Sequence, residues 1–174
     1  MRTRFLQIIV LVICLSWMPG MYSLGQTTTV YIVRHAEKYT MDTTNKNPPL
    51  SNAGKKRVKA LDKRLKGVPL AAVFSTATIR TEETAGPLAL ANGVDVQHYD
   101  AKNLAALVEK IKASYPGKNV LVVGHSNTVR PTVNALGGVA TKENIPDYVY
   151  NLIYTVTIDA SGKVDVVQGT YGKK

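Results

Sequence analysis

The chain has 174 residues, a length that favours one compact domain with room for a leader or a tail. Hydrophobic residues make up 45% and charged residues 20% of the sequence, which is typical of a globular protein and excludes a wholly disordered chain. The 22 Lys and Arg residues outnumber the 12 Asp and Glu residues, and the net charge of +10 suits an anionic partner: a phosphate ester, a nucleic acid or a membrane surface.

Residues 1–25 have the features of a signal peptide. Two arginines near the start supply positive charge, the almost wholly apolar run 5–18 follows, and small residues stand just before Gln26. The apolar run is shorter than the roughly 20 residues of a membrane-spanning helix. We therefore expect cleavage on export, a mature domain 26–174 in the periplasm or outside the cell, and no stable membrane insertion; the alternative is a retained anchor.

Cleavage at this point would remove Cys14, the only cysteine. The mature domain would then have no disulfide, no thiolate zinc site and no cysteine nucleophile. The remaining sequence has neither the ligand spacing of a zinc site nor a glycine-rich nucleotide loop. We therefore expect a domain without a metal or an organic cofactor, stabilised by its packed core alone.

The secondary-structure elements follow from the spacing of apolar residues. Buried strands are expected where short runs rich in β-branched residues lack polar alternation, and helices where apolar residues recur every three or four positions. In chain order the sequence predicts a strand at 29–33, a helix at 51–66, a strand at 71–74, a helix at 79–91, a strand at 94–99, a helix at 104–114, a strand at 119–123 and a helix at 128–136.

In the C-terminal part of the chain, two strands follow each other without a helix between them. Residues 151–158 and 164–170 flank a turn that contains Gly162, as in an antiparallel hairpin. Since the preceding strands alternate with helices, the predicted fold class is α/β: a three-layer α/β/α sandwich with a mainly parallel sheet and the antiparallel C-terminal hairpin at its edge. The one long polar connection, residues 42–49, is expected to form a flap beside the site.

Three of the predicted strands end in residues that suit phosphate chemistry. The carboxyl ends of parallel strands meet at one edge of the sheet, where ligands bind in such folds. Residues at the ends of the first, second and fourth strands should therefore lie close together. These residues are Arg34, His35, Arg80 and His125.

A phosphoryl-transfer site can be built from these four side chains. Arg34 and Arg80 offer planar forks of donors that match phosphate oxygens. An imidazole is a nucleophile that is neutral near pH 7, so we expect His35 to attack phosphorus in line. His125, as a cation or a neutral donor, would stabilise the equatorial oxygens, and water would hydrolyse the phosphohistidine.

The order of these motifs resembles that of the histidine phosphatase superfamily, the phosphoglycerate mutase-like proteins. The resemblance spans most of the mature chain and implies that His35 is the nucleophile, that Arg34, Arg80 and His125 bind phosphate, and that no metal is required. It is closest to the small phosphohistidine phosphatases, because the segment after the third strand is short. The matching strings are VYIVRHAE at 30–37, PLSNAG at 49–54, FSTATIRTEETA at 74–85 and VVGHS at 122–126.

Two positions depart from the family pattern. Ala36 stands where the family usually has a glycine after the nucleophile. The glutamate acid of the larger branch has no counterpart in the short segment after the third strand. Asp100 is the best-placed substitute, although an Asp before a helix is also an ordinary cap; Glu37 and Glu83 are weaker candidates.

The sequence thus predicts an exported, metal-independent phosphatase that hydrolyses a phosphomonoester or a phosphohistidine through an intermediate on His35. Its substrate would be a phosphorylated small molecule or a phosphoprotein. A phosphate-binding or phosphoprotein-binding module without turnover is one alternative, and a phosphomutase is a less favoured one. Nucleic acid is not expected as a partner, because the lysine-rich stretch 55–66 has no interleaved aromatic residue.

Overall fold

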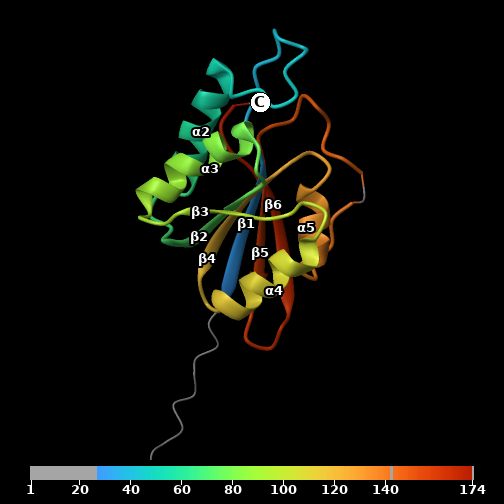
Figure 1. Cartoon of the computed structure of the whole chain (residues 1–174). Coiled ribbons are helices and arrows are strands. Elements are labelled where there is room, and N and C mark those ends of the chain that lie inside the picture. The colour runs from blue at the N-terminus through green and yellow to red at the C-terminus, as the bar shows by residue number, and fades with distance from the viewer. Residues whose placement is uncertain (1–26, 142, 174) are drawn as a thin grey trace, which may run out of the picture.

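The computed structural model describes residues 27–141 and 143–173. In this part of the chain, a six-stranded sheet lies between two layers of helices, so the predicted α/β/α sandwich is confirmed (Figure 1). No helix among the described residues is long and apolar enough to cross a membrane. The predicted signal peptide lies outside these residues and stays a prediction.

The sheet is parallel in its first part and antiparallel at one edge. Its strand order is β3-β2-β4-β1-β5-β6, with parallel pairing from β3 to β1 and antiparallel pairing of β5 with β1 and with β6. The C-terminal hairpin therefore lies at the edge, as predicted. The strands are β1 (Thr28–Arg34), β2 (Leu70–Ser75), β3 (Val96–His98), β4 (Asn119–Gly124), β5 (Leu152–Ile158) and β6 (Val164–Thr170).

The register of the parallel strands aligns the ends that carry the predicted site. Arg34 of β1 lies opposite Gly124 of β4, and Ser75 of β2 lies opposite Val123 of β4. The carboxyl ends of β1, β2 and β4 therefore lie at nearly the same level of the sheet. The edge strand β3 is shorter than the predicted 94–99 because it pairs on one side only, with three residues of β2.

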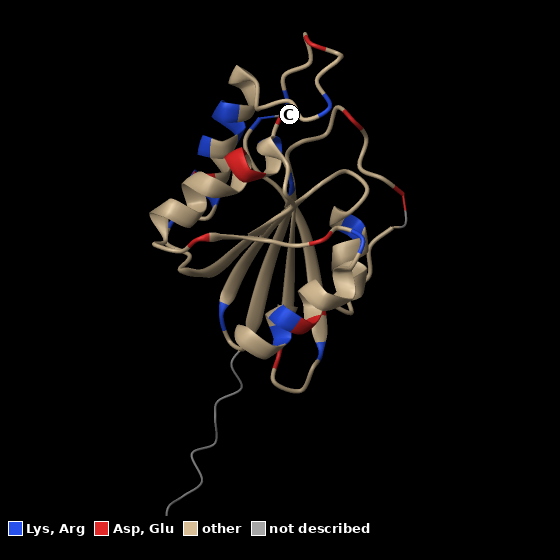
Figure 2. Ribbon diagram, in the orientation of Figure 1, with Lys and Arg blue, Asp and Glu red and all other residues tan. Residues whose placement is uncertain are grey.

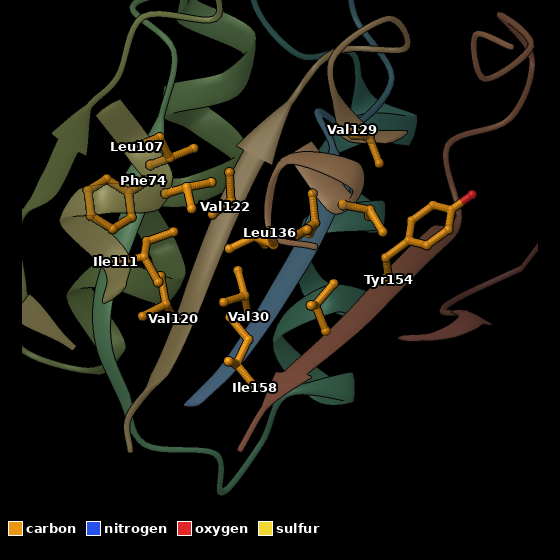
Figure 3. Packing of buried hydrophobic residues seen from close by; sticks show 14 of the residues in the cluster. Val30, Phe74, Leu107, Ile111, Val120, Val122, Val129, Leu136, Tyr154 and Ile158 are labelled. Carbon is orange, nitrogen blue, oxygen red and sulfur yellow. The ribbon is translucent and has the colours of Figure 1, made fainter. Parts of the chain in front are cut away.

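Each face of the sheet is covered by two helices (Figure 1). One core lies under α4 and α5 and is shown in Figure 3; Phe74, Ile111 and Leu136 are among its fully buried side chains, each stabilising the fold by about 1.5–3 kcal/mol. A second core lies under α2 and α3 on the other face. The helices are α2 (Asn52–Arg64), α3 (Ile79–Ala91), α4 (Leu104–Ser114) and α5 (Val129–Ala135).

The start of α2 explains part of the PLSNAG string. The Ser51 hydroxyl accepts a hydrogen bond from the Gly54 N–H at 3.1 Å, which caps the helix. A Cβ atom on Gly54 would overlap the carbonyl oxygen of Glu37, so only glycine allows this approach. Several of the positive charges visible in Figure 2 lie on α2, and its Lys55 and Lys59 are exposed.

Candidate active site

The four residues singled out at the strand ends line one open pocket of about 520 Å³. Arg34 is the last residue of β1 and His35 follows it, Arg80 lies in the first turn of α3 after β2, and His125 follows β4. The centroids of the two imidazole rings are 5.4 Å apart, with 67° between their planes. The parallel sheet thus brings together residues that are up to 91 positions apart in the chain.

The His35 ring is held in one tautomer. Its Nδ1 lies 2.7 Å from the carbonyl oxygen of Ala36, and since a carbonyl can only accept, Nδ1 carries the proton. The unprotonated Nε2 is then the nucleophilic atom. His35 is 4% exposed, and burial, reinforced by the charges of Arg34 and Arg80, lowers the His35 pKa to about 3. The ring is therefore neutral at pH 7, as a nucleophile must be.

Ala36 fits where the family usually has glycine. No residue other than glycine has a positive φ in the described chain, so the Ala36 backbone is in an ordinary conformation. Its side chain is fully buried, and its N–H donates to the Thr84 hydroxyl at 3.0 Å. The methyl group therefore adds to the core without disturbing the residue that precedes it.

Arg34 is fixed by a loop far away in the sequence. Its Nη1 donates to the carbonyl oxygens of Pro146, Asp147 and Val149 at 3.0–3.1 Å. Its Nη2 contacts the Asp147 carboxylate at 3.3 Å, and its guanidinium lies 4.2 Å from the centroid of the Tyr150 ring. The guanidinium is thereby held rigidly at the floor of the pocket.

Both arginines carry a buried donor without a partner. Among the described residues, Nε of Arg34 and Nε of Arg80 make no hydrogen bond, although each is shielded from solvent. Leaving a buried donor unsatisfied costs about 1–3 kcal/mol, so such groups are rare unless a ligand completes them. Burial and the neighbouring Arg34 lower the pKa of Arg80. An oxyanion bound between the two guanidinium groups would relieve this repulsion.

The hydroxyl groups of Thr76 and Thr81 form a hydrogen-bonded chain that ends at His125 Nε2. The Thr81 hydroxyl has carbonyl acceptors in Thr76 and Thr78 at 2.8 Å, so its oxygen faces Thr76 Oγ1, at 3.1 Å, as an acceptor. The Thr76 hydroxyl then donates to Thr81, and its oxygen accepts from His125 Nε2–H at 2.8 Å. In the neutral ring the proton therefore lies on Nε2 and the free lone pair on Nδ1.

His125 is neutral in the free pocket. Burial is the main cause, and the charges of Arg80 and Arg34 add to it, so that the His125 pKa falls to about 4. A phosphate dianion would oppose the arginine charges and favour protonation. The expected cation is thus a property of the complex, whereas the free protein presents a neutral ring.

The structure does not bring the candidate acids into this pocket. Asp100 lines a separate pocket beside Phe74 and accepts a hydrogen bond from the Lys102 N–H at 2.8 Å in a turn, whereas Asn103 caps α4. Glu37 is paired with Arg57 at 2.7 Å. The Glu83 carboxylate accepts from the Leu50 N–H at 2.6 Å. All three carboxylates thus have structural partners.

Sequence reasoning missed several residues at the pocket, all of them polar. Ser126 and Asn127 follow His125 directly, so a helix start next to a histidine was the available signal. Asp147 has no such signal, because it reaches Arg34 across 113 positions of sequence. It is the one carboxylate among the described lining residues. The residues missed are Lys38, Ser126, Asn127, Asn144 and Asp147.

The pocket geometry agrees with a match to a known family. The model of the histidine phosphatase superfamily (branch 1) matches residues 30–102, which include most of β1 together with His35 and Arg80. The chain therefore resembles the histidine phosphatase superfamily over this part of its length. His125 lies beyond the matched residues, follows β4 and completes the pocket. No curated protein matches the sequence of the chain.

Solved structures of several phosphatases share the fold of this chain. The protein histidine phosphatase SixA, complexed with tungstate, has a TM-score of 0.62 and 21% identity over 82% of this chain and 96% of its own. Phosphoserine phosphatase from Entamoeba histolytica, in complex with 3-phosphoglyceric acid, has a TM-score of 0.60 and 12% identity over 84% and 98%. A mycobacterial glucosyl-3-phosphoglycerate phosphatase has a TM-score of 0.58 and 11% identity over 85% and 100%.

Proposed function

We propose that this protein is a phosphatase that takes the phosphoryl group of its substrate onto Nε2 of His35. The observation that carries the proposal is that the guanidinium groups of Arg34 and Arg80 line the same pocket as a neutral imidazole. Donors of this kind bind an oxyanion, and the neutral ring supplies the nucleophile. The substrate is a phosphomonoester or a phosphohistidine, and the reaction needs no metal.

The reaction has two steps. In the first, the Nε2 lone pair of His35 forms a bond to phosphorus while the bond from phosphorus to the leaving oxygen or nitrogen breaks. Arg34, Arg80 and a protonated His125 hold the equatorial oxygens, where negative charge concentrates. In the second, water attacks phosphorus, the bond from phosphorus to Nε2 breaks, and the products are inorganic phosphate and the free imidazole.

The identity of the pocket residues favours substrates with good leaving groups. An alkoxide must gain a proton as it leaves, and a positioned acid typically contributes about 10²–10⁴-fold. Asp147, the carboxylate at the pocket, is 97% exposed and paired with Arg34, so it is poorly placed to be a proton donor. Phosphohistidines and aryl esters depend less on such a donor, and we propose them ahead of alkyl esters.

We also propose that the enzyme acts outside the cytoplasm. The support is the positive, apolar and small-residue pattern of residues 1–25. The test is mass spectrometry of the mature protein: an N-terminus at Gln26 in the periplasmic or secreted fraction is expected, and an intact leader in the cytoplasm would contradict the proposal.

Trapping the intermediate tests the reaction. Wild-type protein is mixed with phosphoramidate and quenched at alkaline pH, and an acid-labile, base-stable adduct on His35 is expected. His35→Ala should lose the adduct and at least about 10³-fold of turnover. Asp100→Asn, a control outside the pocket, should retain both.

Two other outcomes separate the alternatives. Saturable phosphate binding without an adduct would indicate a phosphate-binding module and overturn the proposal. Transfer of the phosphoryl group to a second position of the substrate, in place of release to water, would indicate a phosphomutase.

A further inference from the structure

Large exposed hydrophobic side chains are concentrated around the pocket. Among the described residues seven such side chains are exposed, and four of them belong to segments that line or adjoin the pocket. Three of the four are adjacent in sequence to residues that line the pocket, namely to Lys38, Arg80 and Asp147. We call this set the apolar rim. Its members are Tyr39, Met41, Ile79 and Tyr148, which are 46%, 83%, 40% and 85% exposed.

The segments that carry the apolar rim are tied to the pocket and to each other. The Ile79 N–H donates to the Asn47 side chain at 3.0 Å, which links the start of α3 to the loop that holds Met41. The Tyr39 N–H donates to the Pro49 carbonyl at 2.8 Å. On the other side, the loop of Tyr148 is the one whose carbonyls hold Arg34. Figure 1 shows both loops beyond the same end of the sheet.

The pocket and its rim differ sharply in chemistry. Every side chain that lines the pocket is polar or charged, so a small phosphate ester held there gains nothing from the apolar rim. Met41 and Tyr148 are largely exposed to solvent in the free protein. Only a substrate that extends beyond the pocket can bury them, and burial of one large side chain favours binding by about ten- to a hundredfold.

The polar groups between the rim residues fit a polypeptide better than a lipid surface. Ser126, Asn127 and Asn144 offer both donors and acceptors, which pair with peptide N–H and C=O groups. The exposed carboxylates of Asp147 and Glu143 would repel an anionic bilayer. We propose that the apolar rim binds a polypeptide that carries the phosphoryl group and has apolar side chains next to the phosphorylated residue. This inference rests on the proposed function, because it places that phosphoryl group in the pocket.

Equilibrium binding tests the inference without turnover. The probes are two peptides of equal length and charge, each with a central phosphonomethyl-phenylalanine, a non-hydrolysable phosphotyrosine analogue. One has leucine and valine on both sides of it, the other glycine and serine. Benzylphosphonate is the small reference ligand. With the wild-type protein, we expect the apolar peptide to have a Kd at least about tenfold below that of the polar peptide.

The double variant Met41→Ser/Tyr148→Ser should bring the two peptide Kd values within about twofold. Leu90→Ser is the matched control, because Leu90 is 84% exposed but lies at the far end of α3, roughly 16 Å along the helix from Ile79. It should preserve the difference. Equal Kd values in the wild type, or a difference that survives in the double variant, would overturn the inference.

The two experiments distinguish an error in the inferred role of the apolar rim from an error in the proposed function. If His35 forms the acid-labile adduct but the two peptides bind equally, the phosphatase assignment stands and the polypeptide substrate is wrong. If no adduct forms but the apolar peptide binds more tightly through the rim, the protein is a phosphoprotein-binding module.

Discussion

Two cavities of similar volume lie on this molecule and differ in the polarity of the residues that line them. The pocket at the strand ends has about 520 Å³, and a groove between α2 and α3 has about 550 Å³. The groove is lined by apolar atoms of Val58 and Pro87 and by the stems of surface lysines. Apolar cavities are the usual sites for small ligands, so volume and polarity alone would favour the groove.

The difference lies in which polar groups are satisfied. At the groove, the Glu83 carboxylate is bound by the Leu50 N–H, and no buried polar atom of its described lining residues lacks a partner. In the pocket, two guanidinium N–H groups are buried and unpartnered, and both imidazoles are held neutral. Unsatisfied polar groups cost stability and are retained where a ligand completes them. They mark the pocket as the functional cavity.

Among variants that contrast the two cavities, the largest effect should come from altering a guanidinium in the pocket. Arg80→Lys keeps the charge but removes the planar fork, and we expect kcat/KM for an aryl phosphate to fall by about 10²-fold. Lys59→Gln removes a charge at the groove and should change kcat/KM by less than about twofold. Equal losses in the two variants would mean that overall positive charge, and not the pocket, determines activity.

The neutral His35 should make stability depend on pH. Its pKa is about 3 in the folded protein against 6.5 when exposed, so the unfolded chain binds a proton first on acidification. Stability is therefore fully present above pH 6.5 and is lost as the pH falls toward 3, by about 2 kcal/mol at pH 5.

Urea unfolding at pH 7, 6 and 5 measures this loss, and His35→Gln should show a shallower decline than the wild type. Parallel declines would show that the imidazole is not held neutral by burial. Added phosphate should reduce the loss, because an anion in the pocket favours the protonated rings.

A smaller effect on kcat/KM is expected from altering the hydroxyl groups that are hydrogen-bonded to His125. Thr81→Val removes the oxygen that accepts from Thr76, so Thr76 is free to donate to His125 Nε2 and the proton moves to Nδ1. We expect kcat/KM to fall by roughly three- to tenfold. Histidine ¹⁵N NMR should show the change of tautomer, and Thr81→Ser should restore both readings. A loss of activity without a tautomer change would assign Thr81 a packing role only.

The smallest effect belongs to the groove. A Cβ atom on Gly86 would meet nothing within 4 Å apart from its chain neighbours, but Pro87 follows directly, and a proline disfavours the helical conformation of a preceding residue that has a Cβ. This clash opposes the gain in helix propensity, so Gly86→Ala should change the free energy of unfolding by less than about 1 kcal/mol. Thermal unfolding measures the change, and kcat/KM should stay within about twofold of the wild type. A marked change in kcat/KM would show that the groove communicates with the pocket.

The sequence alone determined the fold class and the four residues of the pocket. Alternating strands and helices require parallel pairing, and parallel pairing brings the ends of β1, β2 and β4 to one edge. Arg34, His35 and His125 follow from strand ends that can be located by hydrophobic pattern, and Arg80 follows from the first turn of the next helix. These are local signals, so a single sequence was enough.

Only the tertiary structure decided how those residues are held and which carboxylates accompany them. The loop that holds Arg34 lies more than 110 positions away in the sequence, and it has no periodic pattern of apolar residues from which its position could be predicted. Asp100 seemed well placed because it follows β3, but its chain leaves the sheet toward α4 and a separate pocket. Contacts between loops depend on where the packed helices and strands place the ends of those loops. The contact of Asp147 with Arg34 and that of Thr76 with His125 could therefore be identified only from the tertiary structure.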